Sequence, residues 1–365
     1  MILTRHNLLR FLLSNNCISL RELLNDCWEV HDYSSKNNNF AFISSSKGLF
    51  IKQCISDGDK ASLFGLERES DCYILVGGLA SLNGIIPKLI HYFEKERILV
   101  TEYVVASINM FSYCRSNEVC LQRTASLLGM ELSRCHFSLS QVVKFSDKGV
   151  KFVNQKPSIF TPEIMSEGGD VSIAQRQCLN IVKKHSDLMN GLTSLDSEWR
   201  VNGLIHNDMK LENCLVRFSN EDPEKKSIVG VTFIDWERVN IGDIAWDLAG
   251  IIEGYLTLLS SAMQQQAKKT HLFDHSLELG EISGQVRAAL RVFWAAYIEG
   301  SKIEPTYTHT LLKRVAKYSA ARLIQSTYNK LEGRDELGLD ALLQIQLAQN
   351  LLSDPELNRE KLFGF

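Results

Sequence analysis

Residues 204–216, which read LIHNDMKLENCLV, are the most informative stretch of the chain. Apolar residues frame a polar octet, so one strand-like run leads into a tight loop and another leads out. Within the octet, Asp208 stands five residues before Asn213. Phosphoryl transfer to a hydroxyl group needs a carboxylate that takes the acceptor's proton and oxygen ligands that hold Mg²⁺. The octet contains both: Asp208 as the candidate base and Asn213 as a candidate metal ligand.

A second element supports this interpretation. Residues 231–237, VTFIDWE, form an apolar β-type run that ends in Asp235. A hairpin that joins the runs 204–218 and 227–235 would return the chain to the loop and place Asp235 beside Asn213. We therefore predict Asp235 as the second Mg²⁺ ligand.

The two segments HNDMKLEN (206–213) and FIDWERVNIGDIAWDLAG (233–250) together resemble the aminoglycoside phosphotransferase and choline kinase-like family. This family is the small-molecule branch of the protein-kinase fold, and the resemblance is close over residues 204–250. It implies ATP and Mg²⁺ as cofactors, Asp208 as base, and Asn213 and Asp235 as metal ligands. It also implies that Asp247 is a structural residue that braces the catalytic loop.

The N-terminal half should then hold the nucleotide. Lys52 lies in an apolar strand-like run, which would bury its stem and direct its ammonium group at the α- and β-phosphates. We expect its partner on the following helix and choose Glu69 over Glu67. Residues 101–105, TEYVV, end a strand at the predicted lobe boundary, and we expect the backbone of Glu102 and Val104 to bind adenine.

The loop expected to cover the phosphates departs from the protein-kinase pattern. Residues 34–40 read SSKNNNF and contain no glycine, although close approach of backbone to phosphate favours glycine. Asparagine adopts left-handed backbone more readily than most residues, so we assign Asn39 to this loop.

Lys210 is a second departure, because small-molecule kinases of the resembled family more often have histidine there and protein Ser/Thr kinases have lysine. A cation at this position can neutralise the transferring phosphoryl group. Lys210 is therefore a candidate catalytic residue that favours a peptide or protein acceptor. His136 and His206 are interpreted as structural residues of the loop region.

Periodicity indicates an α+β chain with a two-lobed, protein-kinase-like fold, a small β-rich N-lobe and a large helical C-lobe. We assign residues 1–30 to an N-terminal helical extension, 31–105 to the nucleotide-binding N-lobe and 106–365 to the C-lobe with the catalytic and metal-binding loops. In the C-lobe, helices are predicted over 121–136, 173–190, 244–264, 284–298, 309–330 and 336–352.

Composition excludes several other classes. The 40 Lys and Arg balance 43 Asp and Glu, with no block of like charge, so we expect no nucleic-acid partner. The nine cysteines show no C-x-x-C pattern and are expected to be reduced thiols. The apolar run near the N-terminus is too short for a signal sequence or membrane span. We expect a cytoplasmic protein without a membrane partner.

Three functions stay open. The first is an ATP- and Mg²⁺-dependent kinase that phosphorylates a hydroxyl of a small molecule; carboxylates such as Glu253, Asp274 and Glu299 are candidates to bind a cationic acceptor. The second is a Ser/Thr kinase of a peptide or protein, for example of a precursor peptide in lanthipeptide-like natural-product maturation. The third is a catalytically dead kinase fold that serves as a binding module.

Overall fold

The computed structural model describes residues 1–34, 37–55, 60–116, 121–145, 152–162, 171–219, 227–269 and 275–354. Contacts divide the chain into two compact units. Unit 1 comprises residues 1–110, 144–152 and 213–239, and unit 2 comprises residues 111–143, 153–212 and 240–365. The first unit therefore takes in the N-terminal helices and a later segment with Asn213 and Asp235, a division that differs from the predicted boundaries at 30 and 105.

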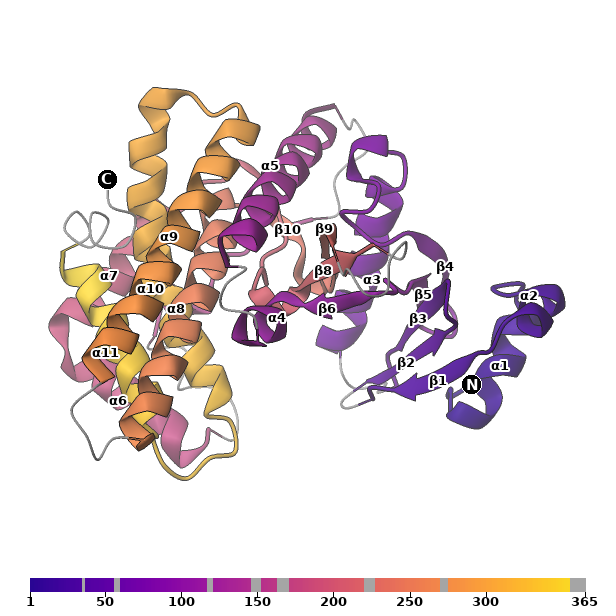
Figure 1. Ribbon diagram of the computed structural model, residues 1–365, viewed down its shortest axis with the longest axis horizontal. Helices are drawn as coiled ribbons and strands as arrows, with labels where there is room; N and C mark the ends of the chain where they lie inside the picture. The colour runs from indigo at the N-terminus through magenta and orange to yellow at the C-terminus, as the bar shows by residue number, and fades with distance from the viewer. Residues whose placement is uncertain are drawn as a thin grey trace. The chain divides into compact units, whose positions relative to one another are not determined.

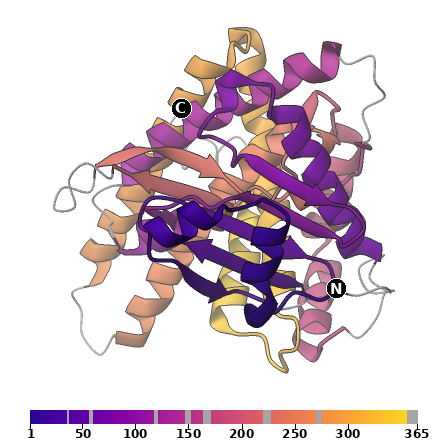
Figure 2. The same cartoon turned by 90° about the vertical axis from the view of Figure 1, so that its right-hand side faces the viewer.

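Unit 1 is built on antiparallel sheets. Its elements are α1 (Arg5–Ser14), α2 (Leu20–Asn25), β1 (Glu29–Asp32), β2 (Asn38–Ile43), β3 (Gly48–Gln53), α3 (Lys60–Val76), η1 (Ala80–Leu82), β4 (Leu89–Phe93), β5 (Ile98–Glu102), β6 (Ser107–Asn109), β8 (Cys214–Phe218), β9 (Ile228–Phe233) and η6 (Trp236–Arg238). Five strands form a sheet in the order β1-β2-β3-β5-β4, and three more form the sheet β6-β8-β9. Figure 2 shows the β8–β9 hairpin as a pair of salmon arrows.

One face of the five-stranded sheet carries the core of unit 1. Alternate strand residues point to the same face, and Phe40, Phe42, Ile51 and Val100 on this face pack with apolar side chains of α1. Figure 1 shows α1 and α2 beside β1 and β2. The predicted N-terminal helical extension packs on the sheet, because α1 supplies part of the sheet's core.

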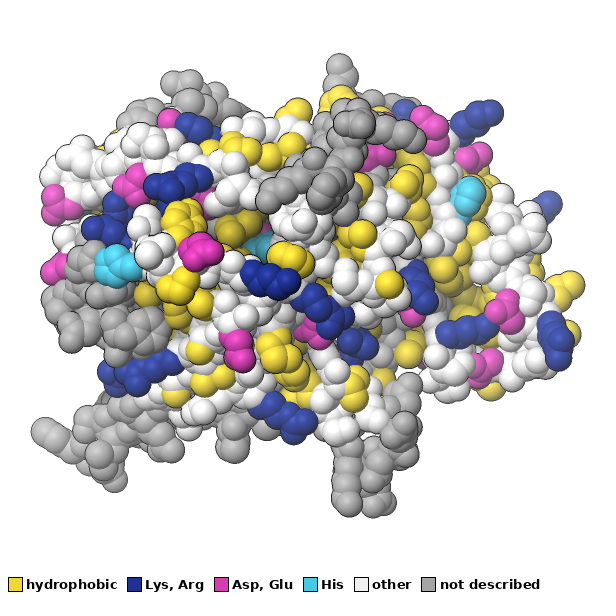
Figure 3. All heavy atoms as spheres, turned by 90° about the horizontal axis from the view of Figure 1, so that it is seen from above, with side chains coloured by type: hydrophobic (Ala, Val, Ile, Leu, Met, Phe, Trp, Pro, Cys, Tyr) yellow, Lys and Arg dark blue, Asp and Glu magenta, His cyan; other side chains and the backbone are white. Residues whose placement is uncertain are grey.

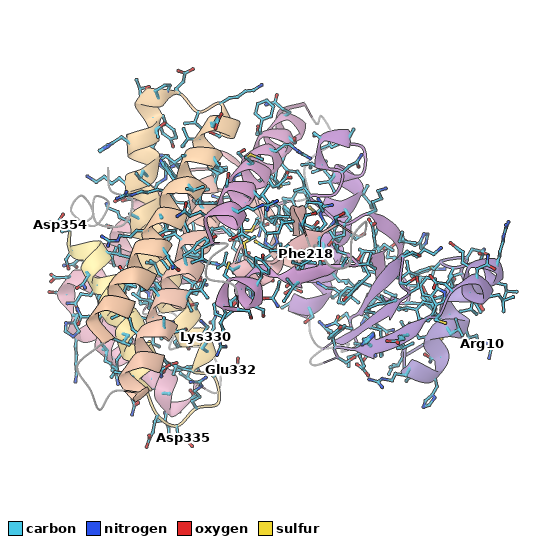
Figure 4. All side chains as sticks on the ribbon, viewed as in Figure 1. Arg10, Phe218, Lys330, Glu332, Asp335 and Asp354 are labelled. Atoms are coloured by element: carbon cyan, nitrogen blue, oxygen red, sulfur yellow. The ribbon has the colours of Figure 1, made fainter. Side chains whose placement is uncertain are left out.

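Unit 2 is mainly helical. Its elements are α4 (Met110–Ser116), α5 (Leu121–Phe145), η3 (Ser158–Phe160), α6 (Ile173–Lys184), α7 (Ser186–Glu198), β7 (Gly203–Ile205), η5 (Leu211–Asn213), β10 (Asn240–Gly242), α8 (Ile244–Lys269), α9 (His275–Ser301), α10 (Pro305–Lys330) and α11 (Leu339–Ser353). Helix α10 packs against both α8 and α11. After α10 the chain turns through Glu332 and Asp335, which Figure 4 labels beside Lys330.

Aromatic side chains fill the core of unit 2 around α8 and α10. The Trp246 ring contacts Phe160, Trp199 and Tyr318, with ring centroids 5.6 to 6.4 Å apart. Edge-on aromatic pairs of this kind add to the stabilisation that their burial provides. The core thus anchors the first turn of α8, which also carries Asp247.

The predicted α+β class, with a β-rich N-terminal part and a helical C-terminal part, is confirmed. The predicted helix 173–190 is wrong as one element, because His185 has extended backbone angles and separates α6 from α7. Strands β1, β6 and β10 were not predicted. Each has three or four residues, too few to show an alternating pattern.

The surface carries charges of both signs. On the face drawn in Figure 3, basic and acidic side chains of the described residues are interspersed. None of the helices among the described residues combines the length and the apolar character needed to cross a membrane.

The packing of α1 leads to a stability prediction. Leu12 is fully buried in the core of unit 1, so Leu12→Ala should lower the free energy of unfolding by about 2 to 5 kcal/mol. Leu24→Ala is the matched control, since Leu24 on α2 is 82% exposed. Urea denaturation of both variants checks the prediction, and equal small losses in the two would contradict the packing described for α1.

Candidate active site

In unit 1, three charged side chains meet on the sheet face opposite α1. Lys52 alternates with Ile51 along β3, so its side chain leaves the core face and points to the other side. Its Nζ lies 2.8 Å from Glu69 Oε2 of α3 and also pairs with Asp235 Oδ1. The partner expected for Lys52 on the following helix is therefore in contact with it.

Glu69 is a buried member of this cluster and has a second hydrogen-bond partner on α3. Glu69 is only 2% exposed, and Tyr73, one turn further along α3, donates its hydroxyl to Glu69 Oε1 at 3.1 Å. Burial raises the pKa of the Tyr73 phenol well above its usual range, so this hydroxyl stays a donor. Tyr73 thus holds one carboxylate oxygen of Glu69 and leaves the other for Lys52.

The charge of Lys52 is fixed by its neighbours. Burial by itself would lower the pKa of Lys52, but attraction from Glu69 and Asp235 outweighs it, and the pKa is raised above the usual value. Lys52 therefore carries its positive charge at any physiological pH, as a phosphate-binding group requires.

The β8–β9 hairpin brings Asp235 to Asn213 as predicted. Cys214 pairs with Phe233, and the amide of Ile234 donates to the carbonyl of Asn213 at 3.0 Å. Asp235 itself has a φ of 69°, a left-handed conformation that aspartate adopts more easily than most residues. With this backbone conformation directly after β9, the Asp235 carboxylate points toward Lys52.

The carboxylate of Glu237, to which the sequence analysis assigned no role, also lies in this cluster. One side-chain oxygen from each of Glu69, Asp235 and Glu237 lies within 4.8 Å of the others. Glu237 lies on η6, which packs closely on α3; a Cβ added at Gly65 would lie 3.4 Å from the Glu237 Cβ. Carboxylate and amide oxygens are the ligands that Mg²⁺ prefers, so these residues, with Asn213 adjoining, fit a magnesium ion.

In unit 2, Asp247 holds the loop that carries Asp208. The carboxylate of Asp247, 1% exposed, accepts the backbone amides of His206 at 2.7 Å and of Asn207 at 2.9 Å. Asn207 has a φ of 65°, and such conformations persist where surrounding contacts hold them, often at active sites. The bracing role expected for Asp247 is confirmed.

His136 extends this network. Its Nε2 lies 3.2 Å from Asp247 Oδ2, and its Nδ1 lies 2.9 Å from the hydroxyl of Tyr297 on α9. Because an ionised carboxylate only accepts, Nε2 donates to Asp247, and in the neutral imidazole Nδ1 accepts from Tyr297. His136 therefore contacts the loop of Asp208 through Asp247, in line with the structural role expected of it, while Tyr297 was not predicted.

The two residues predicted for catalysis lie together. Lys210 Nζ donates to Asp208 Oδ2 at 2.8 Å, and the amide of Asp208 contacts His206 Nδ1 at 3.3 Å. Asp208 is thus fixed from both sides, with a cation on one carboxylate oxygen.

The other residues predicted to bind the nucleotide lie in unit 1. Asn39 is a strand residue of β2, opposite Lys52 in register, rather than part of an open loop; residues 35 and 36 of the predicted phosphate loop lie outside the described residues. Glu102 ends β5 and its amide donates to the Lys88 carbonyl at 2.8 Å, while the Val104 carbonyl accepts from the hydroxyl of Ser107.

The three carboxylates suggested for an acceptor have different surroundings. Glu253 is buried on α8 and accepts hydrogen bonds from Thr257 and Ser326, so the structure gives it an internal role. Glu299 is exposed on α9, and Asp274 lies outside the described residues.

Comparison with known proteins agrees with this geometry. Residues 176–276 match the model of the phosphotransferase enzyme family, and this segment contains Asp208, Asn213, Asp235 and Asp247. No curated protein sequence matches the chain. The resemblance carried by the two motifs is thereby confirmed for that segment.

Solved structures match over nearly the whole length. A choline/ethanolamine kinase family protein from Mesorhizobium loti aligns with a TM-score of 0.54 and 14% identity, covering 98% of each chain. The ethanolamine kinase of Plasmodium vivax gives 0.53 and 13%, covering 96% of this chain and 88% of its own. The GDP and kanamycin complex of APH(2")-IIia gives 0.53 and 14%, with 97% and 99% covered. These likenesses confirm the protein-kinase-like fold.

The Asp247 network leads to a second prediction. In Asp247→Asn, one of the two oxygens that accept loop amides becomes an amide nitrogen that cannot accept. A buried donor is then left unpaired, and the free energy of unfolding should fall by about 2 to 4 kcal/mol. Chemical denaturation measures the loss. Asp187→Asn, at an exposed first-turn position of α7, is the control, and a loss no larger than in this control would contradict the bracing role.

Proposed function

We propose that the chain is an ATP- and Mg²⁺-dependent kinase that transfers the γ-phosphate to a hydroxyl group of a small molecule. The observation that carries the proposal is the Lys52–Glu69–Asp235 ion-pair cluster of unit 1, in which Glu69 is buried. It joins the three side chains that phosphate and metal binding would need. Asn213 of that unit stands five positions after Asp208, which lies in the braced loop of unit 2.

In this proposal Lys52 binds the α- and β-phosphates, and Glu69, fixed by Tyr73, orients it. The backbone at Glu102 and Val104 binds adenine. Asn39, beside Lys52 in the sheet, takes a place near the phosphates where protein kinases have glycine. The burial of Glu69 supports this assignment, because a buried carboxylate that holds a lysine restricts the lysine to one direction.

Asn213 and Asp235 are the proposed Mg²⁺ ligands, and Glu237 is close enough to contribute. When bound, the ion neutralises charge on the transferring phosphate. The chain's part is to fix the ligands: the hairpin sets Asn213 against the residue before Asp235, and the left-handed backbone of Asp235 sets the direction of its carboxylate.

Asp208 is the proposed catalytic base. It orients the acceptor hydroxyl and takes its proton as the phosphate transfers. The bonds from Asp247 to the loop amides hold the backbone before Asp208, so the carboxylate keeps its direction without reorganisation. Lys210 would place a positive charge at the developing negative charge of the phosphoryl group.

The acceptor class rests on similarity. The matched structures are those of choline and ethanolamine kinases and of a kanamycin-bound phosphotransferase, and the chain spans nearly all of each. These names support a small amino alcohol or amino sugar as the acceptor.

One observation favours the second candidate, a Ser/Thr kinase of a peptide. Lys210 lies 2.8 Å from the base, in the position where protein Ser/Thr kinases have lysine. A peptide acceptor therefore belongs in any substrate screen.

A transfer assay tests the proposal. Purified protein is incubated with γ-labelled ATP, Mg²⁺ and a panel of amino alcohols, aminoglycosides and Ser/Thr peptides. Label on a small molecule is expected, and Asp208→Ala should reduce its rate by about 10³-fold or more while nucleotide binding persists. Label only on peptides would select the second candidate. Unchanged turnover in the variant would remove Asp208 from the mechanism.

Nucleotide binding provides an independent prediction. Mg²⁺–ATP should raise the melting temperature of the wild type, and Asp235→Ala should lose most of that shift because a metal ligand is gone. The same titration with ATP and EDTA is the control. Equal shifts for wild type and variant would rule out Asp235 as a ligand, and no shift for either would favour the dead-kinase alternative.

A further inference from the structure

Arg322 of α10 contacts the backbone of the catalytic loop. Its Nη2 donates to the carbonyl of Met209 at 2.7 Å, and Met209 is the residue between Asp208 and Lys210. The guanidinium lies over the indole of Trp246, 5.1 Å from the ring centroid, and the residue is 7% exposed. A side chain remote in sequence thus reaches the backbone of the one residue that lies between the two proposed catalytic residues.

Within the described part of the chain, the charge of Arg322 is not balanced by an ion pair. Among the residues that the structure describes, no carboxylate pairs with its guanidinium. Arg314, two turns earlier on the same helix, is equally buried but forms two hydrogen bonds with Asp243, at 2.7 and 3.2 Å. Burying a guanidinium without a carboxylate is unfavourable for stability. Its contact with the loop carbonyl gives Arg322 a different role from that of Arg314.

The backbone of helix α8 packs closely against the same Met209 carbonyl. A Cβ added at Gly250 would lie 1.9 Å from the Met209 oxygen and 3.0 Å from Arg322 Nη2, and one added at Gly254 would lie 2.5 Å from Leu211 Cγ. The loop backbone therefore rests directly on α8 at two successive turns. Between the helix surface and the guanidinium, the Met209 carbonyl has one orientation available.

We propose that Arg322 is a positioning residue for phosphoryl transfer. By fixing the peptide between Met209 and Lys210, it sets the direction in which Lys210 leaves the backbone, and so maintains the 2.8 Å contact between Lys210 and Asp208. The role in transfer rests on the proposed function, whereas the effect on the loop does not depend on it.

The test compares Arg322→Met, Arg322→Lys and the control Arg314→Lys in the full-length protein. Methionine keeps a long apolar side chain over Trp246 but cannot donate, and lysine retains a charged donor. We expect kcat of Arg322→Met to fall about 10- to 100-fold, with KM for ATP changed less than about twofold, and Arg322→Lys to recover part of the loss. Arg314→Lys should lower the melting temperature and leave kcat within about twofold.

Hydrogen–deuterium exchange provides a readout without turnover. Amides of residues 206–211 should exchange faster in both Arg322 variants and at the wild-type rate in Arg314→Lys. Unchanged kcat, or loop exchange no faster than in the control, would overturn the proposal. If wild type transfers no phosphate while loop exchange responds to Arg322, the kinase proposal fails and the positioning of the loop stands. If Arg322→Met does not fold, the same criteria apply to Arg322→Lys.

Discussion

The ion-pair cluster around Lys52 is the constraint on which the rest of unit 1 depends. Glu69 is almost fully buried and the Lys52 side chain is 16% exposed, and a buried charge without its partner is strongly destabilising. Strand β3, helix α3 and the turn after β9 must therefore meet at one point. Each supplies one member of the cluster, and Tyr73 satisfies the oxygen of Glu69 that Lys52 does not contact. A sheet with an apolar face on α1 and a charged cluster on the other face is the result.

The loop of unit 2 that carries Asp208 is held through its neutral backbone groups, which bond to charged side chains. Asp247 accepts the amides at the start of the loop, and Arg322 donates to the carbonyl of Met209 beyond Asp208. The glycines of α8 allow the backbone to lie between these two anchors. In the proposed function, fixed dipoles and a fixed base would need no reorganisation during reaction, which is the arrangement that electrostatic catalysis favours. The buried network of His136 and Tyr297 then makes α5 and α9 part of the support for the loop.

The features of the fold and site that depend on short stretches of sequence could be predicted. The segment 204–216 and the run that ends in Asp235 predicted the hairpin and the position of Asp235 beside Asn213, and periodicity along the chain predicted the α+β class, because strand alternation and turns are short-range properties. The choice of Glu69 over Glu67 came from resemblance and from the expected helix, and the contact with Lys52 agrees with it. Asn39 was placed in a loop and lies in a strand, since a run of asparagines does not distinguish a turn from the start of β2.

The residues that sequence reasoning missed all act over long separations. Arg322 reaches Met209 across 113 residues and Tyr297 reaches His136 across 161, so no motif connects them. Glu237 was visible as part of the sequence around Asp235, but its approach to Glu69 depends on the packing of η6 against α3. The apolar face of α1 was recognised as helical, yet only the packed sheet shows that this helix completes the core.

Calorimetric titration of Mg²⁺–ATP into the wild type and Lys52→Met tests the central claim most directly, because the cluster around Lys52 is the group of residues assigned to the nucleotide phosphates. The account predicts that the wild type binds and that Lys52→Met binds at least about tenfold more weakly, a loss of about 1.4 kcal/mol or more. Equal affinity in the two proteins, both correctly folded, would contradict it.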